Sequence, residues 1–463
     1  MGAADARHLL NRTGFDAHLD EVDEYARLSR REAVERVLAG AQTTARARPP
    51  EWVSEWQSPR RIRQMSAEER QALFRDLIEK GLQLKAWWLA EMLTTASPLT
   101  ERMTLFWHNH FTSSLQKVRA PGLMYRQNVL LRRHALGSFS ELLHAASKDP
   151  AMLIYLDSAT NRRGQPNENF AREVMELFTL GEGNYGEQDI KEAARAFTGW
   201  SLDPDTGEYL FRPMLHDDGT KTVLGRTGNL RGEDILDILL ERPETARFVT
   251  AKLWREFVST APANERERAE LERAARALRE SGYSLRAALR ELLASEAFWA
   301  QANRGALIKS PVDLVVGTMR QFDVDFSDAL PFVFLLRNLG QDLFSPPNVK
   351  GWPGGEAWIS SQALLARKQL LERLMRVEEA RMTPAAMEQA LDLKKPMARR
   401  LLQAMMDIKF SARDWLRPFQ GRDMPGTVQT VLLALPPAND GASAAQGADL
   451  LRALTSDPVY QLK

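Results

Sequence analysis

The stretch SAEERQALFRDLIEKGLQLKAWWLAEM, residues 66–92, indicates the fold class of the chain. Ser66 followed by Glu69 forms a capping box, the pattern that begins an α-helix. After it, apolar residues recur at helical spacing through Leu84, Trp87 and Met92. A long helix with one apolar face is typical of a protein built from packed helices.

The same helical periodicity continues along most of the 463 residues. It predicts helices over residues 20–39, 122–146, 167–180, 187–197, 233–241, 243–260, 264–281, 284–299, 311–322, 328–340, 359–378, 384–392 and 397–407. Strand signals occur at residues 209–212 and 221–224, which together predict one small hairpin. We therefore expect a mainly α protein, a large multi-helix single domain over residues 1–463 with at most one small β-hairpin. Residues 382–463 are less distinctive, and they can form a helical appendage to that domain.

Composition and charge exclude several classes of protein. The chain is 44% hydrophobic and 27% charged, as in an ordinary globular protein. Its 62 Lys and Arg residues nearly balance its 61 Asp and Glu residues, so we do not expect a nucleic-acid partner. The absence of cysteine excludes disulfides, thiolate nucleophiles and cysteine-ligated metals. The chain has no apolar run of about 18 residues, so we expect no transmembrane segment.

Three polar strings lie in otherwise helical stretches: FWHNHF (residues 106–111), NENFAREVMELFTLG (167–181) and DIKEAARAFTGW (189–200). Core helices do not need this many imidazoles and carboxylates near their apolar faces. The strings therefore mark a candidate site for chemistry or recognition.

The second string carries the most specific pattern. Asn169, Glu173 and Glu176 are spaced by four and three residues, so their side chains share one helix face. Two carboxylates one turn apart can act as general acid and base, or can bind a divalent cation. This makes Glu173 and Glu176 candidate catalytic residues, with Asn169 and Arg172 as candidate substrate-binding residues. The alternative is an exposed charged face, in which Arg172 pairs with Glu168 or Glu176.

The third string repeats the theme with Asp189, Glu192 and Arg195 on one face. Neither string has the Glu-x-x-His pattern of dinuclear carboxylate centres, so we do not expect a ferritin-like di-iron site. A structural network explains both strings equally well, with Arg172 and Arg195 bridging buried carboxylates.

His108 and His110 of the first string have two interpretations. Residues two apart on an α-helix point about 200° away from each other, so the rings can share an ion only if the helix unwinds near Asn109. One interpretation makes His108 an acid–base group and both residues metal ligands. The other, which the spacing favours, makes at least one of them a hydrogen-bonded core or helix-end histidine.

His216 and Asp217 belong to a fourth polar stretch, with Asp218 and Lys221 just after them. His216 and Asp217 are candidate ligands for a divalent cation, and Lys221 is a candidate substrate-binding residue. The alternative is an ordinary turn, since Asp-Asp-Gly is common turn chemistry.

Three tryptophans lie in or beside the polar strings: Trp107, Trp200 and Trp352. Flat aromatic faces beside carboxylates are typical of a sugar-binding cleft, so all three are candidate substrate-binding residues. The alternative places them in the core of a large helical protein. The chain has no Gly-x-Ser-x-Gly, Walker, Rossmann or His-Glu-x-x-His motif, which excludes the common enzymes that depend on them.

The polar strings, together with five further stretches, resemble the bacterial family known as domain of unknown function 1800. These stretches are ARHLLNRTGF (residues 6–15), DPAMLIYLD (149–157), HDDGTKTVLG (216–225), SPPNVKGWPGG (345–355) and LTSDPVYQL (454–462). The resemblance covers the full length. It implies an exported protein, often encoded beside a sulfatase-like exported protein, and it implies no particular activity. This chain lacks the leader usual in the family, which we attribute to trimming. A periplasmic or secreted location is expected, with the cytoplasm as the alternative.

These observations lead to two functional hypotheses. The first is an extracytoplasmic, hydrolase-like enzyme acting on a glycan or another polar polymer, with the polar strings meeting in one pocket under the 345–355 loop. The second is a non-catalytic binding or assembly partner of the sulfatase-like protein. The enzyme requires a concave, water-accessible site in which Glu173 or Glu176 is at least partly uncovered. A structural network requires both to be sealed and paired with Arg172 or Arg195.

Overall fold

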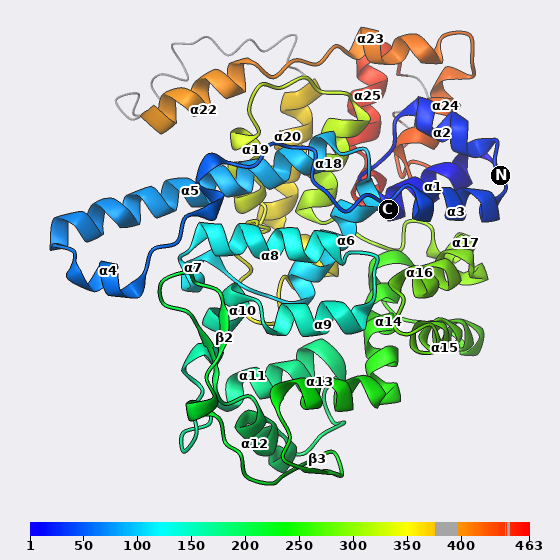
Figure 1. Cartoon of the computed structure of the whole chain (residues 1–463). Coiled ribbons are helices and arrows are strands. Elements are labelled where there is room, and N and C mark those ends of the chain that lie inside the picture. Colours follow the sequence, from blue (N-terminus) through cyan, green and yellow to red (C-terminus); the bar gives the residue numbers. More distant parts are fainter. Residues whose placement is uncertain (376–395, 440, 442–444) are drawn as a thin grey trace.

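Helices dominate the computed structural model of the chain, which describes residues 1–375, 396–439, 441 and 445–463 (Figure 1). Within these ranges the β-structure consists of two small two-stranded sheets. The prediction of a mainly α fold is confirmed. The helix predicted over residues 384–392 lies outside the described residues. No described helix is long and apolar enough to cross a membrane.

The elements follow one another in three groups along the chain. The first group comprises α1 (Ala3–Thr13), α2 (Leu19–Ala26), α3 (Arg30–Ala39), α4 (Pro59–Gln64), α5 (Ala67–Thr94), α6 (Pro98–His110), α7 (Leu115–Val118), α8 (Pro121–Arg133), α9 (Phe139–Ser147) and α10 (Pro150–Tyr155). The second comprises α11 (Glu168–Glu173), the π-helix η3 (Val174–Thr179), α12 (Glu187–Ala196), β1 (Trp200–Leu202), β2 (Tyr209–Phe211), β3 (Lys221–Val223), β4 (Arg226–Gly228), α13 (Gly232–Glu241), α14 (Pro243–Phe257), α15 (Glu265–Glu280), α16 (Leu285–Ala294) and α17 (Glu296–Trp299). The third comprises α18 (Pro311–Gln321), α19 (Leu330–Asn338), α20 (Ser361–Met375), α22 (Pro396–Met406), α23 (Ala412–Leu416), α24 (Met424–Leu432) and α25 (Gly447–Ser456). Single 3₁₀ turns connect them: η1 (Glu51–Ser54), η2 (Ser158–Thr160), η4 (Pro213–Leu215), η5 (Gln301–Asn303), η6 (Gly355–Trp358), η7 (Arg417–Phe419) and η9 (Pro458–Gln461).

Helix α5 forms as the capping box predicts. The Ser66 side chain accepts a hydrogen bond from the amide of Glu69, and the Glu69 carboxylate accepts one from the amide of Ser66. The helix has 28 residues and is therefore about 42 Å long. Its second half is buried in the body, whereas its first half projects from the molecule with α4 (Figure 1).

Three predicted helices are each divided in the structure. The helix predicted over residues 284–299 forms as α16 and α17, because Ser295 caps a new helix. The helix predicted over residues 20–39 forms as α2 and α3, because Ser29 starts a new helix with its own capping box. The helix predicted over residues 122–146 forms as α8 and α9. Here the chain leaves the helical path to pair with a distant turn, since the amide of Phe139 donates to the carbonyl of Tyr283 at 2.8 Å.

The predicted hairpin between residues 209–212 and 221–224 is wrong in its pairing. Strand β2 pairs with β1, so that Trp200 lies opposite Phe211, and β3 pairs with β4. The second pairing follows from a two-residue turn at Leu224 and Gly225, which have φ values of 49° and 83°. A turn with two left-handed residues is the geometry that closes a tight hairpin, and it joins β3 to β4 instead of to β2.

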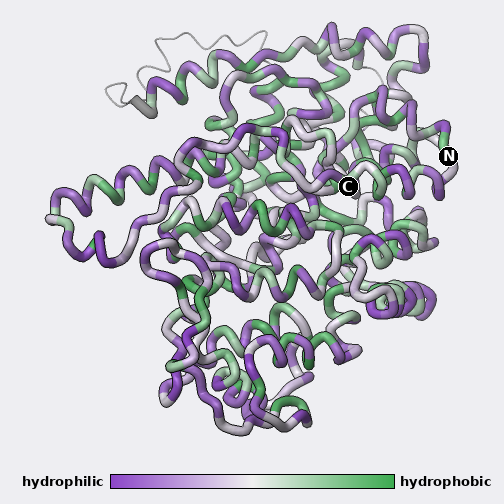
Figure 2. The backbone as a smooth tube through the Cα atoms, viewed as in Figure 1, coloured by the Kyte–Doolittle hydropathy of each residue, from purple (hydrophilic) through white to green (hydrophobic). Residues whose placement is uncertain are grey.

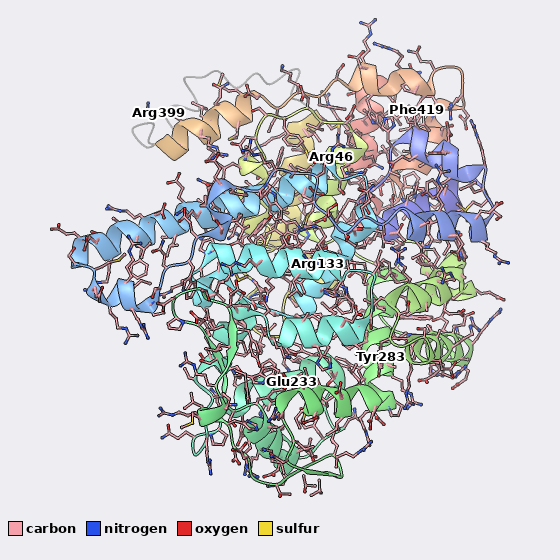
Figure 3. The ribbon with its side chains drawn as sticks, in the orientation of Figure 1. Arg46, Arg133, Glu233, Tyr283, Arg399 and Phe419 are labelled. Atoms are coloured by element: carbon pink, nitrogen blue, oxygen red, sulfur yellow. The ribbon has the colours of Figure 1, made fainter. Side chains whose placement is uncertain are left out.

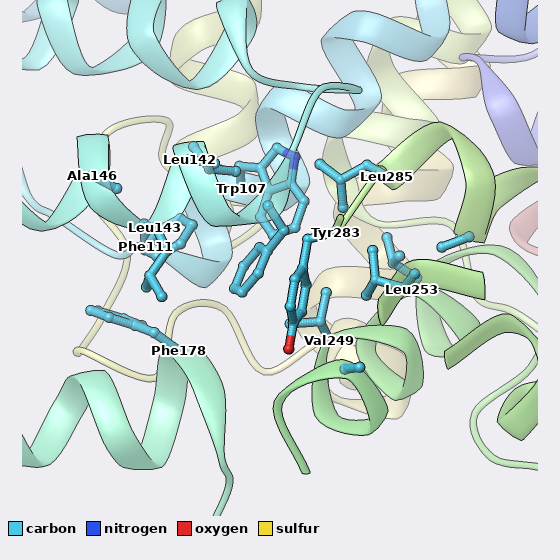
Figure 4. Packing of buried hydrophobic residues seen from close by; sticks show 14 of the residues in the cluster. Trp107, Phe111, Leu142, Leu143, Ala146, Phe178, Val249, Leu253, Tyr283 and Leu285 are labelled. Carbon is cyan, nitrogen blue, oxygen red and sulfur yellow. The ribbon is translucent and has the colours of Figure 1, made fainter. Parts of the chain in front are cut away.

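The core consists of two large clusters of buried apolar side chains. One lies among α6, α9, α13, α14 and α16, where Trp107, Phe111, Phe178 and Leu253 pack together (Figure 4). Tyr283 is a buried member of this cluster (Figures 3 and 4), and its hydroxyl donates a hydrogen bond to the carbonyl of Leu240. The hydropathy of the chain alternates along most helices, as expected when each helix buries one face (Figure 2).

The second cluster joins α5, α18 and α19 to the C-terminal helices. Trp415, Val431 and Leu451 of these helices are buried in it. At the end of the chain, the amide of Lys463 donates to the carbonyl of Leu307 at 2.8 Å. Of the residues predicted as an appendage, 396–439 and 445–463 therefore pack against the body, whereas 382–395 lie outside the described part.

The 345–355 loop joins α19 to η6 without regular structure and is fastened to the end of α6. The amide of Trp352 donates to the side-chain oxygen of Asn109 at 2.7 Å. Gly351 has a φ of 83°, and a Cβ atom at this position would overlap Asn109. Only glycine fits this approach, so the loop and α6 are held in one arrangement.

Candidate functional site

The second polar string changes helix type between its two carboxylates. Helix α11 ends at Glu173, and the chain continues as a π-helix over Val174–Thr179, where a uniform α-helix was expected. The amide of Leu180 donates to the carbonyl of Met175 at 2.8 Å, and the hydroxyl of Thr179 donates to the carbonyl of Val174 at 2.6 Å. Short π-helices inside α-helices occur frequently at functional sites.

Two basic side chains support the π-helix from neighbouring helices. Lys252 of α14 donates from Nζ to the carbonyl of Leu177 at 2.9 Å. His110 of α6 donates from Nε2 to the carbonyl of Phe178 at 3.1 Å, and its Nδ1 accepts from Lys252 at 3.1 Å. Both ring nitrogens of His110 are used within the protein, so the structure gives no support to metal coordination by His110. Burial, and next the charge of Lys252, keep the pKa of His110 well below its usual value.

Glu176 has polar partners on the outer side of the π-helix. Its carboxylate accepts a hydrogen bond from the hydroxyl of Tyr185 at 2.9 Å. Nζ of Lys350, in the 345–355 loop, lies 3.8 Å from the same carboxylate, and the Glu176 side chain is 19% exposed. Burial and the neighbouring Glu176 carboxylate raise the pKa of the Tyr185 hydroxyl.

Glu173 is half-buried and forms no hydrogen bond or ion pair with any residue that the structure describes. Burial raises the pKa of its carboxyl group, and the negative charge of Glu176 raises it further. Burial raises the pKa of Tyr155, and the negative charge of Glu173 raises it further. Two adjacent carboxylates in different environments are the arrangement in which one holds a proton and the other does not.

Arg172 does not contact either of these carboxylates. Its guanidinium pairs with Glu187 at 2.8 and 2.9 Å and with Glu168 at 3.3 Å, and so ties α11 to α12 at the surface. Glu173 and Glu176 are thus partly uncovered and unpaired with arginine. Partial exposure is one part of what the enzyme hypothesis requires, and it differs from the sealed network. The Arg172–Glu168 pair is one that the exposed-face alternative predicts.

Asn169 fastens the start of α11 to the preceding helix. Its side-chain amide donates to the carbonyl of Leu156 at 3.2 Å, at the end of α10. Its backbone amide donates to Asn167, which caps the helix. Asn169 and Arg172 therefore both form hydrogen bonds within the protein. Their contact with a substrate stays a prediction.

His108 lies apart from His110, as the helix geometry predicts. It is fully buried, and its ring contacts Trp88, Phe344 and Trp352 with centroid distances of 5.3–5.7 Å. Neither ring nitrogen has a hydrogen-bond partner among the described residues. Burial lowers the pKa of His108 to about 3, so the ring is neutral at neutral pH. The structure does not support the predicted catalytic and metal-binding roles, because the ring is shielded from solvent by aromatic side chains.

Trp107 and Trp200 belong to the core. Trp107 is buried among Phe106, His110 and Phe111, and Trp200 packs against Phe197 near β1. Neither exposes a face on which a sugar can stack, so the predicted substrate contacts of these two tryptophans are not supported. Trp352 is also buried, although it lies in the 345–355 loop and covers the ring of His108.

The stretch at His216 forms a turn held by its own hydrogen bonds. Nδ1 of His216 lies 2.9 Å from the carbonyl of Thr198, and Nζ of Lys221 donates to the carbonyls of Asp217 and Gly219 at 2.6 and 3.0 Å. The turn interpretation therefore describes this stretch. The predicted roles of His216 and Asp217 as metal ligands and of Lys221 in substrate binding receive no support from these contacts.

Arg195 of the third string completes this second polar cluster. It contacts the Asp217 carboxylate at 2.8 and 3.1 Å and the Glu192 carboxylate at 2.8 Å. The guanidinium lowers the pKa of Asp217 to about 2. In the third string, Arg195 therefore bridges two partly buried carboxylates, which is the kind of contact that the structural-network interpretation describes. Nowhere in the described part of the chain do three or more His, Asp or Glu side chains gather as metal ligands.

The polar strings converge only in part. The second string meets the 345–355 loop at Lys350, and the first string meets it at Asn109. The turn at His216 belongs to the separate Arg195 cluster. A large cavity of about 1580 Å³ lies elsewhere, among α18, α19, α20, α22 and α23. None of the catalytic, substrate-binding or metal-binding candidates from the sequence lines it.

Sequence reasoning missed three residues of the candidate site: Tyr185, Lys350 and Lys252. Lys350 belongs to the 345–355 stretch, and its positive charge is the feature of the sequence that could have indicated a role in the site. Tyr185 follows the glycine-containing turn after the second string, nine residues beyond Glu176. No local signal distinguishes Lys252 from other lysines on amphipathic helices, because its partners come from distant elements.

Comparison with known proteins places the chain in a family. A family model described as "Protein of unknown function (DUF1800)" matches residues 8–462. The chain belongs to the DUF1800 family. No curated protein and no solved structure matches it. The DUF1800 match includes α11, the π-helix and the 345–355 loop, so the candidate site lies inside the region that the family model covers.

Proposed function

We propose that this DUF1800 protein is an extracytoplasmic hydrolase that cleaves a glycan or another polar polymer at Glu173 and Glu176. The observation that carries the proposal is the asymmetry of this carboxylate pair. Glu176 accepts a hydrogen bond from Tyr185 and lies 3.8 Å from Lys350, whereas Glu173 forms no hydrogen bond or ion pair with any described residue. Hydrolysis of a glycosidic bond needs one carboxyl group that donates a proton and a second that is ionised, and two carboxyl groups in different environments can divide these roles.

The two carboxyl groups have separate roles in the proposed reaction. Glu173, whose pKa is raised, donates its proton to the leaving oxygen as the bond between carbon and oxygen breaks. Glu176, oriented by Tyr185, accepts a proton from the attacking water, whose oxygen bonds to the carbon. Lys350 lies at the same carboxylate and contributes positive charge near a polar substrate.

The π-helix supports the proposal because it fixes the segment that carries Glu176. Thr179, Lys252 and His110 satisfy carbonyl groups of this segment from inside the protein. A carboxylate on a well-supported element keeps its orientation, as general acid–base catalysis requires. The alternative is that the same two carboxylates bind a divalent cation. The two possibilities differ in whether the activity depends on metal.

The extracytoplasmic location rests on the family resemblance. The same resemblance supports the second hypothesis, in which the protein binds a sulfatase-like exported partner without catalysis. The uncovered carboxylate pair favours the enzyme, because an assembly role does not require a carboxyl group with a raised pKa.

The proposal is tested by incubating the protein with three kinds of polysaccharide: neutral, acidic and amino-sugar-containing. Wild-type protein purified without chelator should release reducing ends from at least one of them. Glu173→Gln and Glu176→Gln should each abolish the release, whereas Glu182→Gln should retain it. Glu182 is the matched control, because it lies 3.5 Å from Lys350 but is 76% exposed.

Two results contradict the proposal. One is release that continues in the double variant E173Q/E176Q. The other is no release from any polymer while the protein captures its sulfatase-like neighbour, which would favour the assembly hypothesis. Release that is lost on chelation and restored by magnesium or calcium would add a divalent cation to the site.

A further inference from the structure

A separate cavity of about 420 Å³ lies where the projecting half of α5 meets α7 and the start of α8. This volume falls within the range of roughly 300–1,000 Å³ that is usual for small-molecule sites. Neither Glu173 nor Glu176 lines it, so it is independent of the proposed hydrolytic site.

One wall of this cavity is apolar. It is formed by side chains of α5, α7 and α8, namely Phe74, Leu77, Ile78, Leu82, Leu115 and Pro121. Phe74 and Ile78 are large apolar side chains with 43% and 68% of their surface exposed. Helix spacing places Phe74, Leu77, Ile78 and Leu82 on one face of α5, so the projecting half of this helix presents a continuous apolar stripe.

The lining of the cavity also includes three basic side chains. Lys85, Arg119 and Arg337 line it. Lys85 pairs with Asp342 at 2.6 Å, whereas Arg119 and Arg337 form no ion pair with any residue in the described ranges. Burial lowers the pKa of Lys85, and the charge of Arg337 adds to this effect. Three cations with one carboxylate leave an excess of positive charge beside the apolar wall.

We propose that this cavity binds a single-chain anionic amphiphile, with its apolar chain along α5 and its head group between Arg119 and Arg337. The apolar wall and the basic side chains select this class together. A small anion would leave the apolar stripe uncovered, and a neutral apolar molecule would leave the two arginines without a counter-charge. A long-chain carboxylate satisfies both at once.

Isothermal titration calorimetry with monomeric dodecanoate, below its micelle concentration, tests the proposal. We expect saturable one-to-one binding. Acetate, which has the head group alone, and dodecyl maltoside, which has a neutral head, should bind at least about tenfold more weakly, a difference of about 1.4 kcal/mol. Dodecanoate binding should also fall at least about tenfold in Ile78→Glu and in the double variant R119E/R337E.

Two matched controls should bind dodecanoate like the wild type. Met214→Glu introduces the same charge at an apolar side chain that is 91% exposed elsewhere. The double variant R70E/R75E reverses two exposed charges on α5 that do not line the cavity. Circular dichroism should show unchanged helicity in every variant, because the replaced side chains lie at the surface.

Three results would overturn the proposal. The first is dodecanoate binding that is unsaturable, or equal in the wild type, I78E and R119E/R337E. The second is binding to anionic phospholipid vesicles without binding of the monomeric amphiphile, which would make the stripe a membrane-contacting surface. The third is a concentration-dependent dimer in sedimentation velocity that I78E abolishes, which would make a second copy of the chain the occupant.

Discussion

Nζ of Lys252 lies 3.1 Å from Nδ1 of His110, and no carboxylate that the structure describes pairs with this lysine. The amine instead donates to the carbonyl of Leu177 in the π-helix. Burial lowers the pKa of Lys252 from 10.5 to about 7, with a smaller contribution from Arg255. The support of the candidate site therefore includes a lysine that loses its proton near neutral pH.

This lysine makes stability depend on pH. Between pH about 7 and 10.5 the unfolded chain holds a proton on Lys252 that the folded chain has lost, so its contribution to the free energy of unfolding increases with pH. The free energy of unfolding of the wild type minus that of Lys252→Met should therefore increase from pH 7 to pH 10, by at most about 1.4 kcal/mol per pH unit. Urea unfolding at several pH values measures it. The exposed Lys191→Met is the control, and parallel curves for wild type and K252M would contradict the assignment.

Thr179→Val tests the π-helix. The substitution removes the hydroxyl that donates to the carbonyl of Val174, and it should lower the free energy of unfolding by about 0.5–1.5 kcal/mol. Hydrogen exchange of the Leu180 amide, which bonds to Met175, should accelerate in the variant. Thr44→Val, at an exposed residue, should change neither quantity. Unchanged exchange at Leu180 would show that Thr179 does not hold this segment.

Gly351→Ala tests the attachment of the 345–355 loop. Gly351 and Gly225 have the same φ value, 83°, but only at Gly351 would a Cβ atom overlap Asn109, whereas at Gly225 it would meet open space. Both alanine variants should lose about 1–2 kcal/mol from the left-handed backbone, and G351A should lose more. Urea unfolding of the two variants separates backbone strain from the overlap. Equal losses would mean that the loop moves away from α6 freely.

Arg132→Met tests a buried ion pair beneath the first polar string. Arg132 and Glu101 are each about 1% exposed, and Trp88 donates to the same carboxylate. Removing Arg132 leaves a buried charge and should cost about 3–5 kcal/mol in thermal or urea unfolding. The double variant E101Q/R132M should recover much of this loss. Arg172→Met, which breaks a surface pair, should cost no more than about 1 kcal/mol.

The helical content could be predicted from the sequence because helix formation is governed by neighbouring residues. The capping box at Ser66 and the glycine at position 181 act within one turn of the chain. The pairing of the strands could not be predicted in the same way. Residues 209–212 and 221–224 both favour strands, and the turn at Leu224 and Gly225 decided which strands met.

In the candidate site, too, only the relationships set by local spacing could be predicted. The spacing of Glu173 and Glu176 requires that they lie one turn apart, and the helical positions of His108 and His110 require that their rings diverge. Both relationships are present in the structure. The sequence did not distinguish the accessible carboxylate pair from the structural network at Arg195, since each string places two acidic residues three positions apart on a helix that also carries an arginine.

The sequence by itself thus determined the mainly α class, the family and the residues able to carry chemistry, because these depend on local spacing and side-chain type. The tertiary structure alone decided which groups are free to act. It buried His108 and the core tryptophans, tied Arg195 to Asp217, and left Glu173 without a hydrogen bond or ion pair among the described residues. Exposure and pairing depend on residues far apart along the chain, and only the packing of whole helices brings those residues together.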